Sequence, residues 1–201
     1  MVNVDDIYLV MSTIAITHEV PAAKNVNVKE LEQFLSPPIT VGAGLEGSII
    51  GSQRERIEIT TANVKTNVRD LSGQKDFAGS KVGMILNYFV TNFGLKVNSY
   101  GVNFILRVPC SAPGQWIMEN ILSSRISEKT GRKLVSGAAA VSLEAERKTW
   151  NIRFESVDDN KLAVDFNASE KTVELPGADV LSGELKTQWE LLVKFLGDLG
   201  L

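Results

Sequence analysis

The spacing of apolar residues between positions 135 and 166 limits the folds open to this chain more than any other feature. Three successive segments there alternate apolar with small or polar side chains: Val135, Ala139, Val141, Leu143 and Ala145, then Trp150, Ile152 and Phe154, then Leu162, Val164 and Phe166. A period of two is typical of strands with one buried face, and short links make such strands antiparallel neighbours. The sequence therefore predicts an antiparallel meander over residues 134–167.

The first link of this meander also predicts how its strands pair. A two-residue turn at 146–147 places Leu143 opposite Trp150 and Val141 opposite Ile152. These four side chains are then expected on the buried face of the sheet.

Helices are predicted where apolar residues recur at spacings of three and four. This pattern is clear over residues 80–93, where Gly94 follows as a stop signal, and over 179–197, which predicts a long C-terminal helix. A third helix is expected over 114–130 and a fourth, shorter one over 28–35. We expect these amphipathic helices to pack on one face of the sheet.

Three further stretches read as strands, at residues 7–16, 57–68 and 95–108. In the last of these the apolar side chains change face near 99–100, which predicts a β-bulge, and 60–63 predicts a bulge or tight turn. For the whole chain we expect about seven or eight strands, grouped in blocks between helices. The predicted fold class is α+β, with a large, mostly antiparallel sheet.

The chain is long and apolar enough to bury a substantial core. With 201 residues, 44% of them hydrophobic, residues 1–201 are expected to form a single domain. The alternative is a two-lobed organisation, 1–110 and 111–201, sharing one sheet.

The composition of the chain indicates which partners and which cellular location to expect. The 21 basic and 24 acidic residues nearly balance, so we expect no nucleic-acid partner and no membrane partner. No apolar run approaches the roughly 18 to 20 residues of a membrane-spanning helix. The single cysteine, Cys110, cannot form an internal disulfide, which favours a cytoplasmic location.

A glycine-rich segment offers the one pointer to a cofactor. Gly42, Gly44 and Gly47 have the G-x-G-x-x-G spacing of dinucleotide-binding turns, and Asp70 lies about where the ribose-binding acid falls. The flanks disagree with this interpretation, because a Pro-Pro pair at 37–38 precedes the glycines and too little helix pattern follows them. We therefore expect a tight or flexible glycine loop and no cofactor.

Catalytic and metal-binding residues are scarce. Cys110 lies between a strand end and a helix start, where a thiolate is favoured, and His18 is the only histidine to serve as its base. Packing of Cys110 in the core is the competing interpretation. A zinc site needs several cysteine or histidine ligands, so we expect no metal. The acidic pair at 158–159 is expected to form a turn.

One strand carries candidate binding residues. Asn103 and Arg107 lie among Tyr100 and other aromatic positions on the stretch 95–108, and are expected to line a groove if their face of the sheet is covered. In an open sheet they belong to its solvated face.

These features together favour a non-enzymatic module that binds a protein or forms a homo-oligomer through a sheet edge or an open sheet face. The alternative is a small enzyme or nucleotide-binding protein that uses the loop from Gly42 to Gly47.

Overall fold

The computed structural model of the protein describes residues 4–19, 26–43, 47–77, 79–122 and 138–201. The strands within these ranges are β1 (Tyr8–His18), β2 (Ile39–Ala43), β3 (Gly47–Ser52), β4 (Ile57–Ala62), β5 (Lys65–Asp70), β6 (Val97–Pro109), β7 (Ala138–Ala145), β8 (Lys148–Asp158) and β9 (Lys161–Lys171). The helices are the short 3-10 turn η1 (Val4–Asp6) and α1 (Val28–Leu31), α2 (Val82–Phe93), α3 (Pro113–Asn120) and α5 (Ala178–Asp198).

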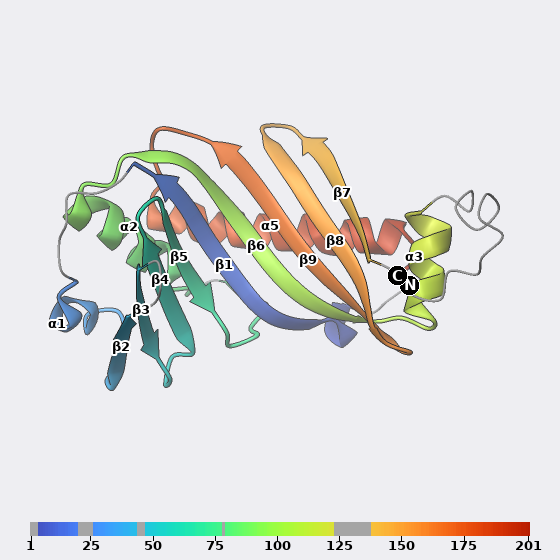
Figure 1. The fold of residues 1–201 in the computed structure, drawn as a ribbon, viewed down its shortest axis with the longest axis horizontal. Helices are drawn as coiled ribbons and strands as arrows, with labels where there is room; N and C mark the ends of the chain where they lie inside the picture. The colour runs from blue at the N-terminus through green and yellow to red at the C-terminus, as the bar shows by residue number, and fades with distance from the viewer. Residues whose placement is uncertain (1–3, 20–25, 44–46, 78, 123–137) are drawn as a thin grey trace.

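All nine strands belong to one antiparallel sheet, in the order β2-β3-β4-β5-β1-β6-β9-β8-β7. Helices α2 and α5 lie behind this sheet in Figure 1, so the viewer looks onto its other face. The α+β class, the antiparallel sheet and the C-terminal helix are therefore confirmed. The sheet takes strands from both halves of the chain, and β1 and β6 pair at its centre.

The helical face of the sheet holds the core. On α5 the buried residues recur every three or four positions, which turns Trp189 and its neighbours toward the strands. The Trp189 ring lies 5.7 Å from that of Phe104 on β6, and 6.3 Å from that of Phe77. Alternate residues of β6 and β9, such as Phe104 and Phe166, are buried on this face, and the residues between them lie on the opposite face.

Helix α2 packs closely against α5 through a glycine. A Cβ atom built on Gly83 would lie 2.9 Å from the Ala178 carbonyl oxygen and 3.2 Å from the Leu181 Cβ. Only glycine therefore permits this approach. The helix ends as predicted, with Gly94 in the left-handed conformation (φ 60°).

The predicted register of the meander is confirmed. Val141 pairs with Ile152 and Leu143 with Trp150 across the β7–β8 hairpin. Leu143 is less buried than expected, with 38% of its surface exposed, because β7 is the last strand of the sheet. At 158–160 the predicted turn is present, and the Asp158 carboxylate accepts a hydrogen bond from the Asn160 backbone N–H at 2.9 Å.

The predicted bulge in β6 is also confirmed, at Asn98. Thr17 on β1 pairs with Ser99, but His18 pairs with Val97, so Asn98 is an extra residue. The pairing of β1 and β6 slips once more, because Val10 is extra between the pairs of Leu9 and Met11.

Three expectations were wrong in detail. The segment around the glycines forms strands β2 and β3, which raises the strand count to nine. The expected helix over 114–130 ends at Asn120, whose side-chain amide donates to the Trp116 carbonyl at 3.0 Å and competes with the helical bond at that position. Residues 123–137, which include the rest of that stretch and the start of the predicted meander, lie outside the described ranges. Helix α1 is likewise shorter than 28–35, with turns after Leu31.

Candidate functional site

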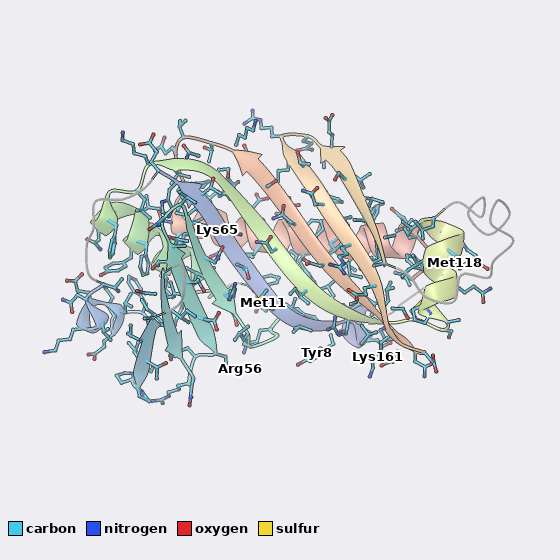
Figure 2. The ribbon with its side chains drawn as sticks, in the orientation of Figure 1. Tyr8, Met11, Arg56, Lys65, Met118 and Lys161 are labelled. Atoms are coloured by element: carbon cyan, nitrogen blue, oxygen red, sulfur yellow. The ribbon has the colours of Figure 1, made fainter. Side chains whose placement is uncertain are left out.

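The face of the sheet opposite α2 and α5, which we call the open face, is the largest candidate site (Figure 2). Within the described residues no helix covers it. One residue from each of the nine strands lies in a continuous line across it, in the order Thr40, Gly51, Glu58, Arg69, Thr13, Asn103, Asn167, Asn151 and Ser142. With strands about 4.8 Å apart, this polar row is about 40 Å long.

Neighbours along the polar row bind one another. The Asn167 amide donates to the Asn103 Oδ1 at 2.5 Å, and the Ser142 hydroxyl donates to the Asn151 Oδ1 at 2.7 Å. At the other end Arg69 forms an ion pair with Glu58. These contacts orient the side chains of the three pairs that make them.

Toward the start of β1 and the end of β6, the open face becomes more apolar around Arg107. Tyr8, which pairs with Arg107 across β1 and β6, is 60% exposed, and Met11 and Ile105 form the next pair along. Figure 2 shows Tyr8 and Met11 along the lower part of β1. These four residues, Tyr8, Met11, Ile105 and Arg107, are called the Arg107 patch below.

Arg107 has no acidic partner among the residues that the structure describes. Its one hydrogen bond there is a long one, 3.5 Å, from the guanidinium to the carbonyl oxygen of Leu106. An arginine fixed on a strand beside an exposed tyrosine and a methionine combines the side chains that are enriched at protein interfaces.

Three residues of β6 were predicted to form a binding surface, and two of them lie on the same face of the sheet. Asn103 and Arg107 both lie on the open face, whereas Tyr100 lies on the helical face and is buried. The alternation along a strand explains this separation, because positions 100 and 103 differ by an odd number. Tyr8 and Met11 were missed, since only the pairing of β1 with β6 brings them beside Arg107.

Gly42 and Gly47 of the predicted fingerprint belong to the two strands of a hairpin. Gly42 belongs to β2 and Gly47 begins β3, so no helix follows them, and Gly44 lies outside the described residues. The strand-turn-helix unit that a dinucleotide site requires is therefore absent at this position. Gly42 does line a hollow of about 570 Å³ on the open face, together with Gly51, Ile49, Val41 and Leu71.

Asp70 lines a second, more polar cleft of about 540 Å³ on the other side of the β3–β4 turn. Its carboxylate accepts a hydrogen bond from the Ser72 backbone N–H at 2.7 Å. Arg56 and Ile57 line both the hollow and the cleft, so Gly42 and Asp70 lie near each other without sharing a cavity.

His18 and Cys110 are far apart. His18 pairs with Val97 at the start of β6, and Cys110 follows its last residue, Pro109. At about 3.3 Å per residue the strand separates them by about 40 Å. Burial raises the pKa of the Cys110 thiol, which opposes a thiolate. The buried His18 ring instead contacts the Thr66 hydroxyl at 3.1 Å and the Glu19 carbonyl at 2.8 Å.

A charged cluster that sequence reasoning missed lies on the helical face. The Lys148 ammonium donates to the Tyr100 hydroxyl and to a Glu170 carboxylate oxygen, each at 2.9 Å, and lies 3.3 Å from Glu184 on α5. Gln188 donates to the Glu184 carboxylate at 2.9 Å. The cluster joins β8, β6 and β9 to α5.

This environment shifts three pKa values. Burial disfavours the charged form of Lys148, but hydrogen bonds with Tyr100 and Glu170 and the charge of Glu184 outweigh it and raise the pKa to about 12. Burial raises the pKa of Tyr100, and Lys148 opposes that rise. The hydrogen bond from Lys148 lowers the pKa of Glu170 despite partial burial. Lys148 and Glu170 are therefore both charged at neutral pH, which is typical of a structural ion pair.

Among the described residues, no three histidine, cysteine or carboxylate side chains lie close enough together to hold a metal ion. Nor is any helix in those ranges both long and apolar enough to cross a membrane. No model of a known protein family matches the chain, and no curated protein is significantly similar to it. The function must therefore be argued from the surface itself.

Proposed function

We propose that this chain is a non-enzymatic binding module that holds a protein partner on the Arg107 patch of its open face. The observation that carries the proposal is an arginine without an acidic partner in the described residues, set beside an exposed tyrosine on an uncovered sheet. Such a site binds a partner that offers a carboxylate to Arg107 and an apolar side chain to Tyr8 and Met11.

The polar row supports the same proposal. Its asparagine and serine side chains keep hydrogen-bonding capacity toward solvent, because an amide has more donors and acceptors than the bonds within the row use. A partner seated on the Arg107 patch would find Asn103 beside it on the same strand. Packing of apolar and arginine side chains would then give affinity, and the polar row would set orientation.

Arg107→Glu is expected to weaken binding of the partner by about tenfold or more, because it replaces an attractive charge at the centre of the patch with a repulsive one. The partner is first captured in source cells by a photo-crosslinking amino acid at position 8, with position 173 (Val173, 92% exposed) as the background control. Binding is then measured by calorimetry with purified proteins.

The matched control is Arg153→Glu, which reverses a charge elsewhere on the open face, where Arg153 pairs with Glu155 at 3.0 Å. Equal losses from the two substitutions, or identical captured proteins at positions 8 and 173, would contradict the proposal.

A second candidate function is supported by the hollow beside Gly42. Its volume of about 570 Å³ is within the range of small-molecule sites, and Gly42 and Gly51 leave its floor without side chains. The alternative function is therefore binding of a nucleotide or another small ligand there.

For the hollow, we expect a ligand from a panel of nucleotides and dinucleotides to raise the melting temperature in a concentration-dependent way. Gly42→Leu should abolish the shift, because a Cβ at Gly42 meets no atom within 4 Å and the leucine fills the hollow without disturbing the strand. Absence of any shift up to millimolar concentrations in the wild-type chain would rule the nucleotides out.

A further inference from the structure

The two edges of the sheet differ in how well they resist pairing with another strand. Strand β2 at one edge is short and follows a Pro-Pro pair, Pro37-Pro38. Strand β7 at the other edge has eight residues, AAAVSLEA, without proline, lysine or arginine, and it pairs with β8 without a bulge. Proline, lysine and bulges are among the features with which sheet edges avoid pairing, and in the part of the chain that the structure describes β7 has none of them.

We propose that two copies of this chain pair through β7, antiparallel about a two-fold axis at Val141, and so join their sheets into one. The inference deepens the proposed binding role by naming a surface of self-association, but it does not depend on the Arg107 patch. A dimer of this kind is isologous, because the same strand serves on both sides.

The symmetry restricts the register. A two-fold axis perpendicular to the sheet makes the strands antiparallel and keeps the helices of both copies on the same face. Residues opposite each other must then share a face. Ala138, Ala140, Ser142 and Glu144 lie on the open face, and Ala139, Val141 and Leu143 lie on the helical face. Only pairings within each set are allowed.

Centring the pair on Val141 gives a self-complementary contact. Glu144 then lies opposite Ala138 of the second copy, Leu143 opposite Ala139 and Ser142 opposite Ala140. Glu144, Leu143 and Ser142 each meet an alanine, Val141 meets its own copy, and no charge meets a like charge. Because the small residues occupy the first part of β7 and the larger ones the second, an antiparallel copy of β7 itself is the best match for this edge.

Centring on Val141 also covers apolar surface. Leu143 is 38% exposed beside Trp150, and the second copy's Ala139 would cover it. If the two-fold axis instead passes through Ser142, Val141 of one copy lies opposite Leu143 of the other, and both are larger side chains. The register centred on Val141 has one contact between larger apolar side chains, Val141 with its own copy, in place of two between Val141 and Leu143. It pairs residues 138 to 144 of both copies.

The register makes a charge test specific. Ala138→Glu places a glutamate opposite Glu144 of the second copy, and we expect the dissociation constant of the dimer to rise about tenfold or more. Adding Glu144→Lys to that variant should restore association, because each introduced glutamate then faces a lysine. Sedimentation velocity over a concentration series gives the constants, and circular dichroism checks that each variant is folded.

Two controls tie the result to this edge. Thr40→Glu places a charge on β2, at the opposite edge, and is expected to leave the dimer unchanged. Arg107→Glu should also leave it unchanged, which separates self-association from binding at the Arg107 patch. Failure of one proposal therefore leaves the other standing.

A cysteine at the symmetry axis tests the geometry directly. Val141→Cys is expected to give a disulfide-linked dimer on mild oxidation, because residue 141 faces its own copy. Val157→Cys, an exposed position on β8, should not, and the native Cys110 is buried. A wild-type chain that stays monomeric at high concentration overturns the proposal. So does a dimer that Ala138→Glu and Thr40→Glu weaken equally, or one that Val141→Cys does not cross-link.

Discussion

Gly83→Ala is expected to lower the free energy of unfolding by about 2 to 3 kcal/mol, the cost of forcing atoms into a closely packed contact. The added methyl group would lie 2.9 Å from the Ala178 carbonyl oxygen and 3.2 Å from the Leu181 Cβ. Neither neighbour is the flexible end of a side chain. Helix α2 must therefore move away from α5, which opens the helical layer over the sheet. Chemical denaturation followed by circular dichroism measures the loss.

A matched glycine gives the opposite result. Gly183 lies inside α5, where a Cβ would meet no atom within 4 Å, so Gly183→Ala should stabilise the protein by about 0.5 to 1 kcal/mol through helix propensity. The two substitutions are chemically identical and differ only in their surroundings. A neutral or stabilising effect of Gly83→Ala would show that α2 and α5 do not pack as described.

Local patterns predicted much of this fold, because they depend on neighbours in sequence. The alternation in the meander predicted both the β7–β8 register and the turn between those strands, since a short hairpin leaves few other registers. The period of α2 and α5 predicted their buried faces in the same way. These elements can therefore be predicted from their own residues alone.

Strands β2 and β3 were missed for a physical reason. Their residues include glycines and follow prolines, which local propensity disfavours in strands. Pairing overrides that preference, because β4 provides a hydrogen-bonded template along Gly47–Ser52. The interpretation of the glycines as a loop was correct only in part, since Gly42 belongs to β2, where it pairs with Ile49, and Gly47 begins β3, where it pairs with Ala62.

The candidate site shows the same limit. The parity of β6 is enough to place Asn103 and Arg107 on one face and Tyr100 on the other. The neighbours of Arg107 come from β1, about a hundred residues earlier in the chain, and the extra residue Val10 decides which of them faces it. No local pattern encodes that pairing, so Tyr8 and Met11 could be recognised only in the folded chain.

Lys148→Met is expected to lower the free energy of unfolding by about 2 kcal/mol near neutral pH, less than for a fully buried ion pair because the cluster is partly exposed. The substitution leaves Glu170 and Glu184 close together without their shared cation. The methionine keeps most of the apolar contact that the lysine stem makes, so most of the loss is electrostatic. Urea denaturation at several pH values measures it.

The pH dependence identifies the cause. The pKa of Glu170 is lowered in the folded state, so the stability it contributes is present above its ordinary value of 4.5 and disappears as the pH falls below it. The pKa of Lys148 is raised to about 12, so its contribution is complete below 10.5 and disappears as the pH rises toward 12. The difference in the free energy of unfolding between wild type and Lys148→Met should therefore be largest between about pH 4.5 and pH 10.5. It should decrease at lower and at higher pH.

The exposed ion pair of Lys161 with Asp158, 3.7 Å apart, supplies the control. Lys161→Met removes the same charge from the next strand of the meander but should cost less than about 0.5 kcal/mol, because solvent screens that pair. If Lys148→Met destabilises the protein equally at about pH 3 and pH 7, the lysine acts through packing alone. A loss confined to the range between the two pKa limits instead means that the Lys148 cluster holds α5 against the sheet by charge.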